Sequence, residues 1–249
     1  IDTASGKILK RVKIGKNPEF VRVRGDMAFV SFEPTSKLGP PPKPGAEKKE
    51  EKKDGGKDGA HGHDDDDDDE DREPAQVAVV DLKAGKVVRN IVGGPETEGI
   101  EFSPDGKSLV VTNEADNTLT LHDIKSGKLV KKVDVEQYGA RPRGIKLSPD
   151  GKTLFVALQS AARQDLANAA TRNNTRLFTY DVSDLDQIAL TGEYAVQLPK
   201  FQQGTSTLVA AQSEILAVSD TQLFILPRDS NGFEVGTEQS NLRRVDVID

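Results

Sequence analysis

A five-residue sequence that occurs twice constrains the fold of this chain more than any other feature. SPDGK stands at residues 103–107 and again, 45 residues later, at 148–152. A second pattern, in which Asp is followed four residues later by Gly-Lys, starts at Asp2, Asp81 and Asp123. Recurrence at a spacing of about 40 to 45 residues is typical of folds that repeat one supersecondary unit.

The clearest repeat unit has four short runs of strand-forming residues, at 99–102, 108–112, 118–123 and 129–135. Pro-Asp-Gly between the first two runs suits a tight turn, because Pro fixes φ and Gly accepts positive φ. Near-continuous apolar runs, as at 77–80, indicate strands that are buried on both faces. These features predict an all-β fold, a β-propeller of four-stranded antiparallel blades.

The length of the chain limits the number of blades. One propeller domain spanning 1–249 accounts for about four blades plus partial blades. We expect an outer strand at 8–14, a third strand at 244–249, and inner strands that begin near the following residues: Phe20, Gly99, Gly144 and Thr207. Propellers with seven or eight blades need about 300 residues. We therefore predict an incomplete ring or part of a larger one, in preference to an unusually small ring.

The units at 96–158 resemble the YVTN-type bacterial β-propeller repeat, with Val111-Thr112-Asn113 in the stretch that gives the repeat its name. The wider set of similar proteins includes lactonase-like propellers and haem-d-type nitrite reductase propellers. The resemblance implies a propeller that is exported from a bacterium, hence periplasmic or extracellular. It implies no single activity, because propellers host many functions.

The acidic charge of the chain is confined to one insert. The formal net charge is −7, and residues 43–73 alone hold seven basic and fourteen acidic residues, so the remainder is neutral. The insert at 34–75 has almost no apolar side chains and is predicted to be disordered. Without a basic patch elsewhere, nucleic acid is not an expected partner. No apolar stretch reaches the roughly 18 residues of a membrane span.

The same insert contains a candidate metal site. His61 and His63 precede a run of Asp from which we select Asp64, Asp65 and Asp66 as further ligands. Imidazole suits Cu or Zn and carboxylate suits Ca, so the candidate cofactor is a divalent cation that a flexible loop binds weakly. A solvated acidic loop without a specific ligand is the alternative, and docking to a basic partner is another.

A smaller insert at 159–175 interrupts the third unit. Residues 161–174 are rich in Ala and include Arg163 and Arg172. They are expected to form either a short helix that docks a neighbouring protein or an extended hairpin loop.

Charged residues occupy matched positions where the inner strands are predicted to begin. Glu19, Glu98 and Arg143 align, and Arg141 lies two residues before Arg143. Inner strands surround the central channel of a propeller, so these side chains are expected to converge there. They form a candidate site for an anion or a small molecule.

A second charged row follows three residues further along each unit. It consists of Arg22, Glu101 and Lys146, which alternate in sign. Alternating signs on neighbouring blades predict salt bridges between the blades, and the same explanation applies to the first row. A structural role for both rows is therefore the alternative to ligand binding.

Catalytic motifs are scarce. The chain has no Cys and no G-x-S-x-G sequence, and His122 is the single His outside the insert. A Cys nucleophile, covalent c-type haem and a Ser/His/Asp set are thereby excluded, and His122 is expected to pack in the core. For a lactonase-type metal site the nearest candidates are Glu98, Asn113 and Glu114.

These observations favour a non-catalytic exported propeller that acts as a binding or scaffolding subunit. Its partner is expected to be another protein, within a larger assembly, because function in such folds concentrates on loops. One alternative is an enzyme centred on the channel, either a lactonase-like hydrolase or an oxidoreductase. Buffering of metal cations by the insert is the other alternative.

Overall fold

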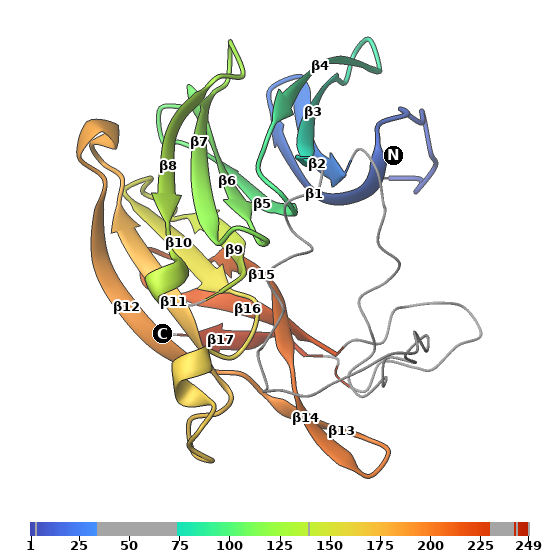
Figure 1. Ribbon diagram of the computed structural model, residues 1–249. Coiled ribbons are helices and arrows are strands. Elements are labelled where there is room, and N and C mark those ends of the chain that lie inside the picture. Colours follow the sequence, from blue (N-terminus) through green and yellow to red (C-terminus); the bar gives the residue numbers. More distant parts are fainter. Residues whose placement is uncertain (3, 34–73, 139, 230–241, 243, 249) are drawn as a thin grey trace, which may run out of the picture.

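The computed structural model describes residues 1–2, 4–33, 74–138, 140–229, 242 and 244–248. This part of the chain is almost entirely β, and its strands form antiparallel sheets that fan around a common centre as four blades (Figure 1). The predicted all-β propeller is confirmed. None of the short helical turns within these ranges has the length and hydropathy needed to cross a bilayer.

The first two blades are complete four-stranded sheets in which each strand pairs with the next one along the chain. The first blade consists of β1 (Lys16–Arg24), β2 (Met27–Glu33), β3 (Gln76–Asp81) and β4 (Lys86–Val92). The second consists of β5 (Thr97–Phe102), β6 (Ser108–Asn113), β7 (Thr118–Asp123) and β8 (Leu129–Asp134), followed by the 3-10 turn η1 (Glu136–Tyr138). The strands of the second blade lie within two residues of their predicted positions.

The third blade is also four-stranded, whereas the fourth has three described strands. The third consists of β9 (Pro142–Leu147), β10 (Thr153–Leu158), β11 (Asn174–Asp181) and β12 (Ala189–Gln197), with the 3-10 turns η2 (Arg163–Asp165) and η3 (Leu185–Gln187) in its loops. The fourth consists of β15 (Ala211–Ala217), β16 (Leu223–Arg228) and β17 (Asp246–Ile248). A separate hairpin, β13 (Lys200–Gln203) and β14 (Ser206–Val209), comes between these two blades in the sequence and projects away from the sheets (Figure 1).

The recurring turns have the same internal bonding in each copy. In the SPDGK turns, the Ser103 hydroxyl donates to Asp105 at 2.7 Å and the Ser148 hydroxyl donates to Asp150 at 2.7 Å. The glycine of each turn has positive φ, 68° at Gly106 and 75° at Gly151. The backbone N–H of Lys107 and the Ser103 hydroxyl hold the pKa of Asp105 below its ordinary value. Local hydrogen bonds to Asp therefore fix the hairpins that the repeated sequence predicted.

Apolar strands pack face to face between neighbouring blades. Phe29 of the first blade meets Phe102 of the second edge to face, with ring centroids 5.1 Å apart. Similar apolar clusters join the second blade to the third and the third to the fourth. His122 is buried within the second blade, where it lies opposite Leu109, and burial lowers the pKa of its imidazole. This agrees with the expected packing role of His122.

Several strand predictions need correction. Thr207 does not begin the fourth inner strand, because it pairs with Gln202 in the β13–β14 hairpin, and the inner strand is β15. Residues 8–14 are not a strand in the structure, and part of this segment packs instead against the first blade through Val12 and Ile14. The predicted third strand at 244–249 is confirmed as β17, which pairs with β16.

The predictions for the two inserts, at 34–75 and 159–175, have different outcomes. Residues 34–73 lie outside the described part of the chain, so the predicted disorder of the insert at 34–75 stays a prediction. The segment at 159–173 forms turns around the three-residue helix η2, and not a longer docking helix. Arg176 of β11 holds this loop through an ion pair with Asp165 at 2.5 Å, and it also pairs with Glu193 of β12 at 3.0 Å.

Two buried hydroxyl groups connect the centres of successive blades. Ser31 of β2 accepts a hydrogen bond from the Phe20 N–H at 3.0 Å and donates to the Glu98 carbonyl at 3.1 Å. Thr112, at the equivalent place in β6, accepts from the Gly99 N–H at 2.7 Å and lies 3.3 Å from the Arg143 carbonyl. These bonds fix the backbone of Glu98 and Arg143 in the adjacent blade.

Gly99 and its counterpart Gly144 provide a matched test of this close approach. A Cβ on Gly99 would lie 2.3 Å from the Arg143 carbonyl oxygen, whereas a Cβ on Gly144 would meet side chains and no backbone, with the Gln212 amide at 3.1 Å and the Ile215 methyl group at 3.2 Å. We expect Gly99→Ala to lower the free energy of unfolding by about 2–3 kcal/mol, because backbone atoms must move, and Gly144→Ala by about 1 kcal/mol or less. Urea denaturation measures both values, and equal losses would contradict the assigned contact.

Candidate functional site

A β-bulge near the start of each inner strand determines which side chains face the centre. The strand pairing is irregular at the same place in all four blades, at 18–21, 97–100, 142–144 and 212–214. A bulge inserts one extra residue and redirects a side chain. The inserted positions include Glu19, Glu98 and Arg143, three of the residues predicted to form the channel site.

The residue before each of the first three bulges adopts a left-handed backbone conformation. The φ angles are 43° at Asn17, 49° at Glu96 and 64° at Arg141. Non-glycine residues in this region carry strain that the surrounding structure must hold in place, and such strain is concentrated at functional sites. The backbone thus turns sharply at the same point in three blades, just before the charged residue.

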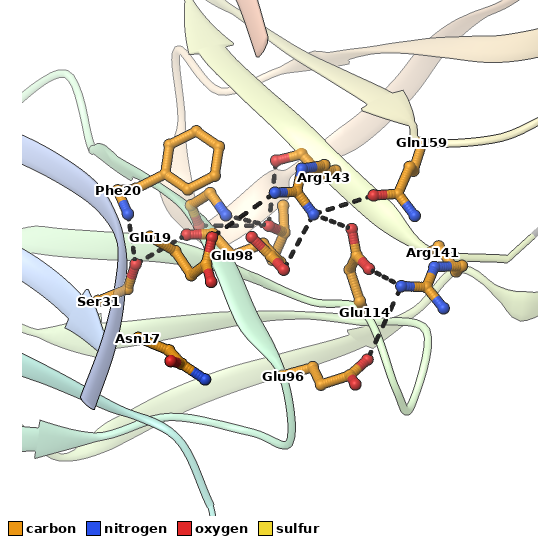
Figure 2. Close-up of polar contacts among 12 residues, drawn as sticks. Asn17, Glu19, Phe20, Ser31, Glu96, Glu98, Glu114, Arg141, Arg143 and Gln159 are labelled. Atoms are coloured by element: carbon orange, nitrogen blue, oxygen red, sulfur yellow. Dashed lines mark hydrogen bonds and ion pairs between the residues drawn. The ribbon is translucent and has the colours of Figure 1, made fainter. Parts of the chain in front are cut away.

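Arg143 lies at the centre of the resulting cluster, which Figure 2 shows. One terminal nitrogen of its guanidinium lies 2.9 Å from Glu98 and 3.0 Å from Glu114, and it also donates to the Gln159 side chain at 2.9 Å. The other terminal nitrogen lies 3.7 Å from Glu19. Through these contacts Arg143 connects the first three blades.

Arg141 extends the cluster toward solvent. It pairs with the fully buried Glu114 at 2.5 Å and with Glu96 at 4.0 Å, and its own side chain is 48% exposed. We call the set of charged and polar side chains at this end of the channel the axial cluster. It consists of Glu19, Glu96, Glu98, Glu114, Arg141, Arg143, Gln159 and Arg228. The structure thus brings together all four residues that the sequence nominated for ligand binding, Glu19, Glu98, Arg141 and Arg143.

Sequence reasoning missed two members of the axial cluster, Gln159 and Arg228. Arg228 ends β16, and its Nη2 donates to Gln159 Oε1 at 3.0 Å. Strand pairing shows that these two residues share one position with Glu33 and Glu114, at the end of the second strand of each blade. A polar residue at the end of each second strand was the signal available in the sequence.

Burial changes the protonation of the axial cluster. Burial raises the pKa of Glu98 to about 8, and the neighbouring Glu114 and Glu19 add to this effect, while Arg143 opposes it. Burial also raises the pKa of Glu19. For Arg143, burial disfavours the charge, but Glu98, Glu114 and Glu19 together outweigh it and raise the pKa. At neutral pH the cluster therefore holds a protonated carboxyl beside a charged guanidinium.

The axial cluster contains buried atoms without a hydrogen-bond partner. They are Glu98 Oε2, Arg143 Nε and Arg228 Nε. Such atoms are rare in native proteins, and each calls for a bound water, an ion or a ligand as its partner. The axial cluster therefore has capacity to bind a small polar group.

The second charged row forms a separate set of ion pairs three residues further along the inner strands. Lys146 lies 2.7 Å from Glu101, and Arg22 lies 3.7 Å from Glu101 and 3.3 Å from Glu214 of β15. These pairs connect neighbouring blades and also join the first blade to the fourth. For this row the predicted salt bridges between blades are confirmed.

The predicted metal ligands cannot be compared with the structure. His61, His63, Asp64, Asp65 and Asp66 all lie outside the described residues. Within the described ranges, no group of three or more His, Asp and Glu side chains is arranged to hold a metal ion. The cation site of the insert therefore stays a prediction.

A comparison with known protein families identifies the family of this chain. Residues 57–249, more than half of its length, match the phytase-like family, described as esterase-like activity of phytase. This chain belongs to the phytase-like family. No curated protein has a significantly similar sequence. Family membership agrees with the propeller that the repeat resemblance implied.

Solved structures with a similar arrangement are larger proteins. They include hydrazine synthase from Kuenenia stuttgartiensis, at 21% identity and a TM-score of 0.43, with 66% of this chain and 40% of that chain covered. A functionally unknown protein from Desulfotomaculum acetoxidans has 19% identity and a TM-score of 0.43, with coverage of 63% and 43%. Dihydro-haem d1 dehydrogenase NirN in complex with DHE has 18% identity and a TM-score of 0.38, with coverage of 62% and 28%. The chain spans less than half the length of each.

The raised pKa of Glu98 predicts how stability depends on pH. Between about pH 5 and pH 8 the folded protein keeps this proton, whereas the unfolded chain, with a Glu pKa near 4.5, has released it. The free energy of unfolding is therefore expected to fall as pH rises through this range, by up to about 1.4 kcal/mol per pH unit from this group. Urea denaturation from pH 5 to pH 9 measures the slope. Glu98→Gln should flatten it, and an unchanged slope would contradict the assignment.

Proposed function

We propose that this phytase-like chain binds a small ester at the axial cluster and hydrolyses it. The observation that carries the proposal is Glu98, a buried carboxyl with a pKa of about 8 and one oxygen free of hydrogen bonds, beside the charged Arg143. A proton donor with a pKa near the working pH is well suited to general acid catalysis. The description of the family, esterase-like activity of phytase, supports the same class of reaction.

The proposed reaction uses water as the nucleophile. Water attacks the acyl carbon or phosphorus of the ester, and its proton passes to the carboxylate of Glu19. The bond to the leaving alcohol breaks, and Glu98 supplies the proton that this oxygen needs. Arg143, which contacts both carboxyl groups, orients them and stabilises negative charge that develops on the ester. A proton returns from Glu19 to Glu98 through solvent, so the cycle closes.

A non-catalytic propeller is the second candidate function. It is favoured by the ion pairs of the axial cluster, in which Glu96, Glu98 and Glu114 each already contact a guanidinium. In this case the cluster holds the blades together, and the chain serves as a binding or scaffolding subunit for a protein partner. The loop at 159–173, which carries the exposed Leu166, is the surface that we assign to such a partner.

Location and repeat type are part of the same proposal. The similarity of residues 96–158 to YVTN-type repeats supports an exported protein that works in the periplasm or outside the cell. In that setting, the insert at 34–75 would bind calcium, copper or zinc weakly through His61, His63 and the Asp residues that follow.

Hydrolysis of chromogenic esters tests the proposed activity. The substrates are 4-nitrophenyl butyrate, a carboxylate ester, and 4-nitrophenyl phosphate. We expect Glu98→Gln to lower kcat by about 100-fold or more on the substrate that is turned over, because the proton donor is lost. The matched control is Glu101→Gln, an equally buried carboxylate on the same strand that belongs to the second row.

The outcomes separate the two candidate functions. Equal losses of activity in the two variants would indicate a general effect on the fold and would contradict the role of Glu98. If the folded wild-type protein turns over neither ester, hydrolysis is wrong and the non-catalytic propeller is favoured. Thermal melting of all variants shows that each is folded.

A further inference from the structure

Arg228 differs from the other two guanidinium groups of the axial cluster. Arg143 lies within ion-pair distance of Glu19, Glu98 and Glu114, and Arg141 pairs with Glu96 and Glu114. Within the described residues, Arg228 has no ion pair, and its one side-chain hydrogen bond is to the neutral amide of Gln159. Among the described residues it is a half-buried cation without a carboxylate at ion-pair distance, although Glu114 and Glu98 attract it from farther away.

Gln159 holds two cations close together. Its Oε1 accepts from Arg143 at 2.9 Å and from Arg228 at 3.0 Å. An amide oxygen carries only a partial negative charge, so it cannot neutralise two guanidinium groups. The three carboxylates around Arg143 lie on the side of the first two blades, whereas Arg228 belongs to the fourth. Arg228 therefore depends on Gln159 for its close contact, whereas Arg143 has carboxylates within ion-pair distance.

Unused hydrogen-bond donors lie at the same place. The Nε atoms of Arg143 and Arg228 are both buried and make no hydrogen bond. Burial and the repulsion of Arg143 lower the pKa of Arg228, and the attraction of Glu114 and Glu98 opposes this effect without reversing it. An oxyanion near these donors would supply the missing acceptor and the missing negative charge together.

We propose that Arg228 is the residue that anchors an anionic group of the ligand, a carboxylate or a phosphate, at the axial cluster. The inference extends the proposed function, because it defines the ester as one that carries a negatively charged oxyanion. Arg228 holds this group on the side of the fourth blade. Glu98, on the second blade, then faces the bond that is broken.

Calorimetric titration with inorganic phosphate and, separately, with acetate tests the inference. The two probes distinguish a phosphate group from a carboxylate. We expect Arg228→Gln to weaken binding of the preferred ion by about tenfold or more, because a charge-assisted hydrogen bond is lost. Arg228→Lys should keep more of the affinity than Arg228→Gln. Arg176→Gln, which removes a guanidinium that is paired with Asp165 near the start of β11, should bind as the wild type does.

Thermal melting adds a readout that separates anchoring from a structural role. Arg228→Gln breaks no ion pair with a described residue, so we expect the melting temperature without ligand to stay the same or rise. Arg176→Gln, which loses two carboxylate partners, should melt at a lower temperature. A clear loss of stability in Arg228→Gln would overturn the inference in favour of a structural arginine.

The binding outcomes are distinct from those of the hydrolysis test. If neither ion binds to the wild type, or if Arg228→Gln binds as tightly as the wild type, the inference is overturned. If phosphate or acetate binding depends on Arg228 while no ester is turned over, the anchor is supported and the proposed hydrolysis fails.

Discussion

Face-to-face packing of apolar strands between blades is the constraint on which the rest of the structure depends. Each blade has two apolar faces that it cannot bury alone, so it packs against the neighbouring blade. The clusters around Phe29 and Ile100, around Phe178, and around Ile215 fill these interfaces in turn. Because the sheets stack in this way, their inner strands meet at the centre.

The charges at the centre are a consequence of this geometry. Backbone hydrogen bonds and two hydroxyl groups hold the inner strands so close that Gly99 has no room for a Cβ. Any charged side chain at this point loses most of its water, which is costly unless an opposite charge is within reach. Arg143 supplies the opposite charge for Glu98 and Glu114 of the second blade. The same loss of water leaves Glu98 protonated near neutral pH.

Local patterns in the sequence were sufficient to predict the blades but not every strand. SPDGK and the Asp turns are fixed by hydrogen bonds within a few residues, so the hairpins follow directly from the sequence. Thr207 misled the assignment because it lies in an apolar run that pairs with its own neighbour, Gln202, and only tertiary contacts distinguish that hairpin from an inner strand. Residues 8–14 have a strand-like sequence without a strand partner in the described structure.

The candidate site was predictable in part for the same reason. Glu19, Glu98 and Arg143 share a position in the repeat, so alignment of the units placed them together. Gln159 and Arg228 share another position of the repeat. Gln159 is neutral, and Arg228 belongs to the least regular unit, so the sequence alone does not align them. Strand pairing shows that their positions are equivalent. The bulges that redirect these side chains depend on pairing as well.

The two charged rows show how the same repeat yields a structural element and a candidate site. In the second row the cations and anions alternate, so Arg22 and Lys146 both find Glu101, and Arg22 also reaches Glu214. In the axial cluster the alternation fails, since Glu19 and Glu98 are adjacent carboxyls and Arg143 and Arg228 share a neutral amide. One side of the channel end therefore has an excess of acid and the other an excess of base. A stability role alone would favour alternation, whereas separated acid and base fit a ligand that has one group to be held and another to be protonated.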